Sequence, residues 1–244
     1  GAVALQIQGV KGQTVTVRHA ETLDGDKLYT ASLRTAKAEI TYICKDGAQV
    51  YSPRFTYMGF RYVGISGIVL EQLEVSAYVL HSVFEETGSF ACSNDLLNKL
   101  QSNVRWAGKS NFVDIPTDCP QRDERQGWTG DISIFASTAC YNFDLSRFLE
   151  KWLKDVRLEQ GWGGGIPMVV PRHGSTPPVV ATACWGDACI LVPWAEYLAR
   201  GNKQLLRRQY PCMKRFLKAA RFWASLSGPG DRRYIWKWLF QFGD

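Results

Sequence analysis

Apolar and polar residues alternate along the first third of the chain, which is the period of strands buried on one face. The alternation is clearest in TVTVRHAE, AEITYIC, FRYVGIS and LEVSAYVL, and DGD and KDG turns separate these runs. Short strands joined by Gly and Asp turns are typical of a β-sandwich, whose two sheets bury the alternate side chains of each strand. The pattern predicts a β-sandwich domain over residues 1–82.

The hydrophobic period becomes helical after the segment EETGSFACSND. Apolar residues then recur at helical spacing, with Ser93 or Asn94 as a candidate N-cap: Leu96, Leu97, Leu100, Val104 and Trp106. Four further helical patterns follow, near residues 132–141, 145–158, 188–199 and 205–223. The sequence therefore predicts an α-helical domain over residues 83–244.

A long loop rich in Gly and Pro, EQGWGGGIPMVVPRHGSTPPVV, separates two of the predicted helices. Loops longer than about 12 to 15 residues are uncommon inside compact domains and are often functional. We expect the rim that holds Gly161 to Val180 to contact a ligand, unless this loop is only a surface excursion.

Composition narrows the class of protein. With 45% hydrophobic residues in 244, the chain is long and apolar enough for a sizeable core. The net charge of +6 comes from scattered Lys and Arg and not from a basic run with interleaved aromatics, so no nucleic-acid partner is expected. No uncharged run approaches the length that spans a bilayer, so no membrane partner is expected either.

The cysteines and histidines give no sign of a metal site. Seven cysteines form no CxxC pair and three histidines lie far apart in the sequence, so neither zinc nor a disulfide framework is indicated. Unpaired cysteines slightly favour a reducing, cytoplasmic location.

One stretch concentrates charge, PTDCPQRDERQGWTGD from Pro116 to Asp131. Its prolines make the start extended, so that Asp118 approaches from a loop while Arg122 and Arg125 supply forked donors. Carboxylates and guanidinium groups suit polyol recognition, and Trp128 offers a flat apolar face to a sugar ring. The alternative is a set of ion pairs that caps a helix start.

A helix start over Asp123 to Asp131 would put Glu124 and Asp131 on one face, two turns apart. A general acid there must be protonated near neutral pH. Neighbouring acids and burial favour the protonated form, whereas Arg122 or Arg125 favour the ionised form, so the balance depends on which neighbour lies closer.

The string IPTDCPQRDERQGWTGD resembles the signature of the bacterial α-L-rhamnosidases, glycoside hydrolase family 78. Other segments are similar to that family in the same order: RHAE, LRTAKA, PRFTYMGFRYV, FACSNDLLNKL, TACYNFDLSRFLEKWLKD and WGDACILVPWAEYL. The resemblance covers nearly all of the chain. It departs at Gln126, where leucine is more usual, and at Met58, where histidine is common.

The resemblance implies a multidomain β + α chain, a β-sandwich accessory domain followed by the first part of an (α/α)6 barrel. Such enzymes release terminal α-L-rhamnose from glycosides or oligosaccharides with inversion, without a metal or organic cofactor. Glu124, the glutamate of RDER, matches the general acid, and Asp187 is a weak match to a sugar contact. The family's rhamnose-contacting positions fall on Asp118, Arg122, Trp128, Asp131 and Trp185.

Two other interpretations stay open beside the rhamnosidase. An inverting mechanism needs a general base about 6.5 to 9.5 Å from the acid, and the family's base lies downstream of Asp244. The chain is then the general-acid half of a site, inactive by itself. The alternatives are another glycosidase on the same barrel and a non-catalytic fragment that binds sugar or packs against a partner.

A half barrel exposes apolar edges, and YIWKWLFQF would be an adhesive C-terminal segment. We therefore expect the isolated chain to self-associate through the exposed barrel edge, as measured by size-exclusion chromatography with light scattering. A monodisperse monomer would contradict this expectation.

Overall fold

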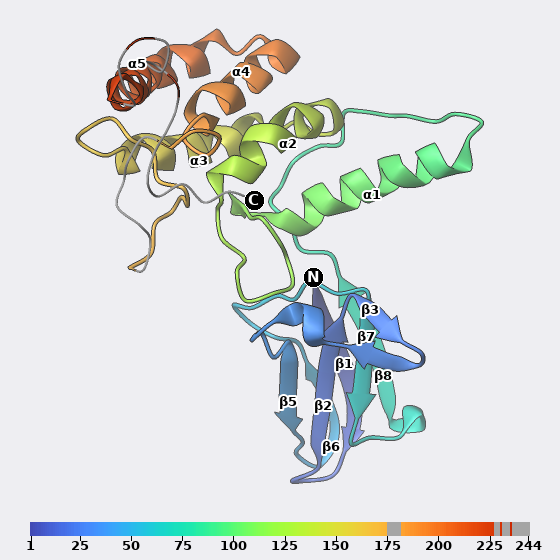
Figure 1. Cartoon of the computed structure of the whole chain (residues 1–244). Coiled ribbons are helices and arrows are strands. Elements are labelled where there is room, and N and C mark those ends of the chain that lie inside the picture. Colours follow the sequence, from blue (N-terminus) through green and yellow to red (C-terminus); the bar gives the residue numbers. More distant parts are fainter. Residues whose placement is uncertain (175–181, 227–229, 231–234, 236–244) are drawn as a thin grey trace. The chain divides into compact units, whose positions relative to one another are not determined.

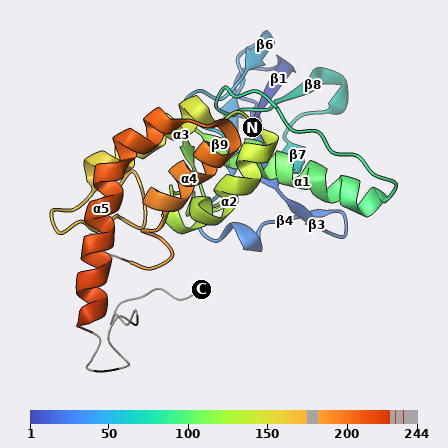
Figure 2. The same cartoon turned by 90° about the horizontal axis from the view of Figure 1, so that it is seen from above.

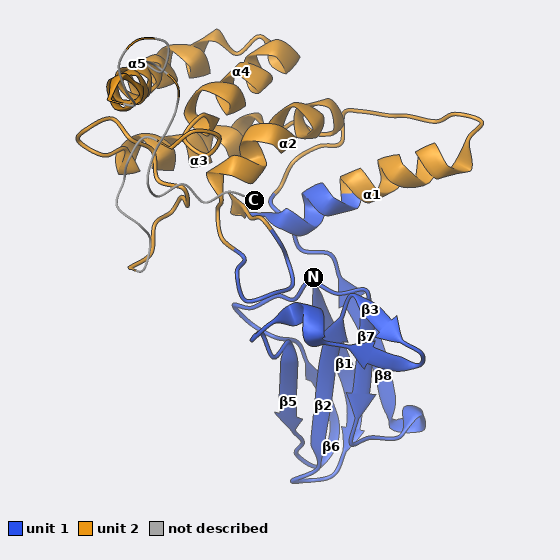
Figure 3. Ribbon diagram, viewed as in Figure 1, with its two compact units in different colours: residues 1–82, 106–113, 119–125 blue, residues 83–105, 114–118, 126–244 orange. Residues whose placement is uncertain are grey.

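The computed structural model describes residues 1–174, 182–226, 230 and 235, and it divides into two compact units (Figure 3). The first, which we call the β unit, comprises residues 1–82, 106–113 and 119–125. The second, the helical unit, comprises residues 83–105, 114–118 and 126–244. The chain thus returns to the β unit twice after its first 82 residues.

Two antiparallel sheets form the β unit (Figure 1). One has the order β6-β1-β8 and the other β5-β2-β7, and β3 pairs with β4 in a separate hairpin. The strands are β1 (Ala2–Gly9), β2 (Thr14–Ala20), β3 (Thr22–Asp24), β4 (Lys27–Tyr29), β5 (Glu39–Ile43), β6 (Gly47–Tyr51), β7 (Tyr62–Ser66) and β8 (Leu73–Tyr78).

Alternate residues of the strands make the core of the β unit. Val3, Leu5 and Ile7 of β1 lie in one buried cluster with Val15 and Val17 of β2. In the second half of β1, Gln6 and Gln8 are exposed, as the period of two requires, whereas Ala4 is buried. The β-sandwich that the sequence predicts is confirmed.

Each helical pattern corresponds to a helix. The helices are α1 (Asp95–Asn111), α2 (Thr129–Asn142), α3 (Ser146–Glu159), α4 (Ala188–Arg200) and α5 (Lys203–Ser225), and short 3-10 helices η1 (Ala31–Leu33) and η2 (Leu70–Gln72) and strands β9 (Phe112–Val113) and β10 (Ile115–Pro116) complete the structure. Asn94 is the N-cap of α1, since its Oδ1 accepts the N–H groups of Leu96 and Leu97.

Helices α2, α4 and α5 pack side by side in the order in which they are named, and α3 contacts α4 and α5 (Figure 2). A polar link joins three of them: Glu196 of α4 is fully buried and accepts hydrogen bonds from Ser146 Oγ at 2.7 Å and Cys140 Sγ at 3.6 Å. Burial and the neighbouring Glu196 carboxylate raise the pKa of Cys140 to about 12, so this thiol stays a donor. These two hydrogen bonds join α2 and α3 to α4.

The apolar face of α1 is less covered than its periodicity suggests. Leu96 is 81% exposed and Leu100 57% exposed. The helix itself follows the sequence pattern, but the described residues do not bury this stripe. None of the helices within the described residues combines the length and hydrophobicity needed to cross a bilayer.

Leu5 is fully buried at the centre of β1, so Leu5→Ala should lower the free energy of unfolding by about 2–5 kcal/mol. The measurement is urea denaturation followed by circular dichroism. Val50→Ala on the neighbouring β6 is the matched control, because Val50 is 73% exposed and should cost less than about 1 kcal/mol. Equal losses for the two variants would contradict this packing.

Candidate active site

The segment at residues 119–125, which holds the RDER motif, folds back onto the β unit. Gly59 permits the close approach, because a Cβ there would lie 2.6 Å from the carbonyl carbon and oxygen of Pro120. Arg125 fastens the end of the segment: its guanidinium donates to Tyr57 O at 2.8 Å and lies over the Tyr57 ring. These contacts hold Arg125 in a backbone conformation with φ 41°, which a non-glycine residue rarely adopts.

Glu124 is held by two guanidinium groups. Arg122 lies 2.8 Å and Arg34 3.0 Å from the same carboxylate oxygen, Oε2. The Glu124 side chain is 22% exposed, so it is partly withdrawn from water. Its other oxygen, Oε1, accepts no hydrogen bond from the described residues. The carboxyl group is therefore oriented through Oε2 alone.

Asp123 faces a different partner. Its Oδ2 accepts hydrogen bonds from the hydroxyl and, at 3.2 Å, from the backbone N–H of Thr35. The Thr35 hydroxyl is the main reason that the pKa of Asp123 lies below its ordinary value. Because Asp123 points to Thr35, the charged side chains that contact Glu124 within the β unit are arginines.

The start of α2 gathers the site residues of the helical unit. Trp128 directly precedes the helix, and Asp131 lies exposed in its first turn. Trp185, which is 9% exposed, packs on this turn at Gly130, where a Cβ would lie 3.1 Å from the indole. Asp118 is joined to the same region, since its Oδ1 accepts the N–H of Gln126 at 2.8 Å.

The loop that follows α3 supports this region. The N–H of Val170 donates to Gly127 O, and Thr129 donates to Met168 O through both its backbone N–H and its hydroxyl. The Trp128 indole Nε1 is buried and has no hydrogen-bond partner among the described residues. A buried indole N–H normally finds an acceptor, so this nitrogen is an unsatisfied donor among the described residues.

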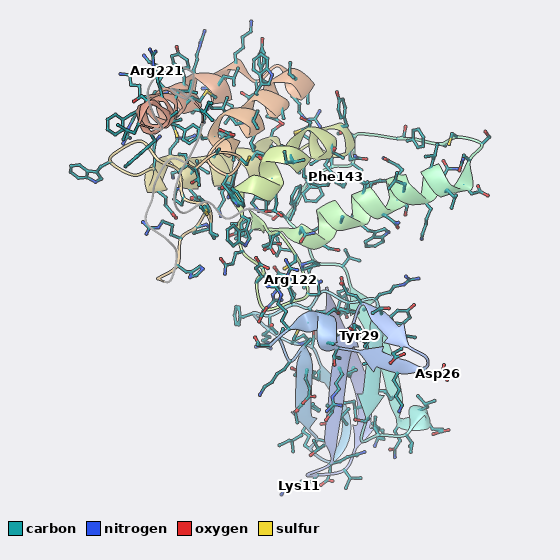
Figure 4. All side chains as sticks on the ribbon, in the orientation of Figure 1. Lys11, Asp26, Tyr29, Arg122, Phe143 and Arg221 are labelled. Atoms are coloured by element: carbon teal, nitrogen blue, oxygen red, sulfur yellow. The ribbon has the colours of Figure 1, made fainter. Side chains whose placement is uncertain are left out.

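The structure brings together the predicted site residues in two groups. Glu124 and Arg122 meet in the β unit, and the helical unit gathers Asp118, Trp128, Asp131 and Trp185. Figure 4 labels Arg122 among the side chains. The first group is a carboxyl group paired with a guanidinium group. The second group combines carboxylates with flat apolar rings, and this combination suits ligands rich in hydroxyl groups.

The structure corrects the expected helix start in this stretch, and it places Arg125 and Asp187 without testing a role for them in binding. The helix start over residues 123–131 is wrong, because α2 begins at Thr129 and Glu124 lies in irregular backbone. The Arg125 guanidinium forms no ion pair with Glu124 among the described residues, because it donates to the backbone oxygen of Tyr57. Asp187 turns its Oδ2 to the N–H of Cys184 at the start of α4. In the rim predicted for Gly161 to Val180, residues 175–180 lie outside the described residues.

Sequence reasoning missed Arg34 and Thr35. Arg34 precedes its partner Glu124 by 90 residues, and Thr35 precedes its partner Asp123 by 88 residues. Periodicity carries no signal for such a contact. The available clue was the family-like segment LRTAKA, which contains both residues.

Thr35→Val removes the hydroxyl that donates to Asp123 and keeps the branched shape. We expect the pKa of Asp123 to rise toward its ordinary value, as followed by NMR titration of its carboxyl carbon. A depressed pKa stabilises the fold above the unfolded-state value of about 3.9, and this contribution is lost as pH falls through the folded-state pKa. The variant should therefore be less stable than the parent at neutral pH, and the difference should close in acid.

Ser32→Ala is the control for Thr35→Val, because Ser32 is an exposed hydroxyl residue on the same short segment. It should leave the titration of Asp123 unchanged. An equal rise in both variants would show that the Thr35 hydroxyl is not responsible.

Comparisons with known proteins show the family to which the chain belongs. A profile of the bacterial alpha-L-rhamnosidase 6 hairpin glycosidase domain matches residues 85–225. A profile of the bacterial alpha-L-rhamnosidase concanavalin-like domain matches residues 1–81. An alpha-L-rhamnosidase of Streptomyces avermitilis is 44% identical over 222 residues, and one of Formosa agariphila is 41% identical over 223.

The chain is short beside these relatives. The matched region is 89% of this chain in both cases, but 21% of the Streptomyces and 24% of the Formosa protein. The crystal structure of the Streptomyces avermitilis alpha-L-rhamnosidase complexed with L-rhamnose is similar at a TM-score of 0.88 with 42% identity, over 95% of this chain and 23% of that one.

Native alpha-L-rhamnosidase from Aspergillus terreus is similar at a TM-score of 0.83 with 43% identity, over 89% of this chain and 26% of that one. The fold is thus a concanavalin-like β domain followed by the beginning of a six-hairpin helical barrel. The chain spans about a quarter or less of the Streptomyces and Formosa relatives, and it belongs to the bacterial alpha-L-rhamnosidase six-hairpin glycosidase family.

Proposed function

We propose that this chain is the general-acid half of an inverting glycoside hydrolase that releases terminal α-L-rhamnose from rhamnosides. The observation that carries the proposal is the match of residues 85–225 to the alpha-L-rhamnosidase six-hairpin glycosidase domain, within which Glu124 is a partly buried carboxyl held through Oε2 by Arg34 and Arg122. The proposal assigns residues 1–82 to an accessory β-sandwich and residues 83–244 to the first part of the catalytic barrel.

Glu124 acts by giving a proton to the glycosidic oxygen as the bond to the sugar breaks. General-acid help of this kind accelerates a reaction by about 10²–10⁴-fold. Oε1 is the oxygen suited to carry the proton, because both guanidinium groups occupy Oε2. When the proton has left, the two arginines stabilise the carboxylate that remains.

The sugar is held by Arg122 and by the residues at the start of α2. Trp128 and Trp185 offer apolar ring faces to the C–H side of rhamnose, and Asp118 and Asp131 accept hydrogen bonds from its hydroxyls.

Inversion also requires a general base on the other side of the sugar, about 6.5 to 9.5 Å from the acid. In this proposal the base comes from a part of the longer relatives that the chain does not span. The isolated chain then binds rhamnosides without hydrolysing them.

The test is a chimera in which this chain replaces its counterpart in the Streptomyces avermitilis relative. We expect the chimera to hydrolyse a chromogenic aryl α-L-rhamnoside and the isolated chain not to. Glu124→Gln should lower kcat of the chimera by about 10²–10⁴-fold on an alkyl rhamnoside, and by less on a nitrophenyl rhamnoside. The better leaving group needs less protonation, so a merely structural role would not produce this split.

Asp123→Asn is the matched control, because it removes the adjacent exposed carboxylate without touching Glu124. It should preserve most of the rate on both substrates. An active chimera in which Glu124→Gln loses nothing would overturn the acid assignment. A folded chimera that hydrolyses no rhamnoside would favour another glycosidase or a binding module.

A further inference from the structure

A basic hollow lies in the β unit, and part of its wall is the segment with Arg34, which contacts Glu124. It has a volume of about 650 Å³, and its lining includes Arg18, Lys27, Arg34 and Lys37. Glu39 is the acidic residue among its lining side chains. The volume falls within the range of small-molecule sites, roughly 300–1,000 Å³.

Two of the four cations are already paired. Arg18 lies opposite Glu39 on paired strands and forms an ion pair with it at 2.6 Å. Arg34 contacts Glu124. The side chains of Lys27 and Lys37 form no ion pair with any residue that the structure describes. The hollow therefore holds uncompensated positive charge, which favours an anionic ligand.

The wall of the hollow is held in a costly backbone conformation. Arg34 has φ 56° and Ala38 φ 46°, both in the left-handed region that L side chains rarely adopt. The buried Leu33 and Ala38 anchor the segment to the β unit, at 0% and 8% exposure. Strain of this kind persists where surrounding structure enforces it and concentrates at ligand sites.

Arg34 connects the hollow to the proton donor, because it lines the hollow and also contacts Glu124. A general acid lies within hydrogen-bond reach of the glycosidic oxygen, so the leaving group begins beside it. We infer that this hollow receives the leaving part of the substrate and selects an acidic sugar there, one with a carboxylate or a sulfate ester. This inference rests on the proposed function.

Lys27 and Lys37 are the residues to change, since both are exposed and neither contacts Glu124. The variant is the double substitution Lys27→Gln and Lys37→Gln. Lys11→Gln is the matched control: Lys11 is an exposed lysine at the other end of the β unit from Arg122 (Figure 4).

The experiment is isothermal titration calorimetry on the full chain with three disaccharides of rhamnose, joined to glucose, to glucuronic acid, or to a sulfated glucose. We expect at least one acidic disaccharide to bind about three- to five-fold more tightly than the neutral one, as two partly exposed ion pairs allow. The acidic disaccharide that binds more tightly than the neutral one shows whether the hollow recognises a carboxylate or a sulfate ester. The preference should vanish in the double variant, persist in Lys11→Gln and shrink with added sodium chloride.

Equal affinity for all three disaccharides, or a preference that survives in the double variant, would overturn the inference. Inorganic sulfate that competes as strongly as the acidic disaccharide would overturn the assignment to a leaving sugar. Failure of the proposed function is distinguishable, because it appears as a chimera without rhamnosidase activity. If the chimera cleaves the neutral aryl rhamnoside but the chain shows no preference for acidic disaccharides, this inference is wrong and the proposed function stands.

Discussion

The placement of Glu124 depends on the docking of residues 119–125 on the β unit. Three side-chain contacts hold the segment: Asp123 with Thr35, Glu124 with Arg34, and Arg125 with Tyr57. Each joins residues that are distant in the sequence, and each uses a charged group, so the hydrogen bonds are stronger than neutral ones. Glu124 thereby gains a fixed orientation that an irregular loop would not give it.

The docking brings a side chain of the β-sandwich onto the glutamate of the RDER motif. Arg34 comes from the end of the short helix η1, and its guanidinium and that of Arg122 share one oxygen of Glu124. The domain that matches the concanavalin-like profile therefore supplies one of the two guanidinium groups on this carboxyl group. The same residue lines the basic hollow, so in the proposed function one side chain would both orient Glu124 and face the leaving sugar.

The helical unit contributes through its packing. The start of α2 is fixed by the loop at residues 166–170 and by Trp185 before α4, while Glu196 ties α2, α3 and α4 together. Because Trp185 packs on Gly130, the segments before α2 and α4 lie at one end of the bundle. Rings from both segments are thus held near the first turn of α2.

Periodicity predicted the sandwich, and it placed the helices to within a few residues, because burial on one face imposes a period of two or 3.6 on the residues themselves. The resemblance of PTDCPQRDERQGWTGD gave the family and the candidate site. Tertiary structure alone decided that Glu124 lies outside α2, that Arg34 and not Arg125 contacts it, and that Thr35 engages Asp123. Such choices depend on contacts between distant segments, which no local pattern encodes.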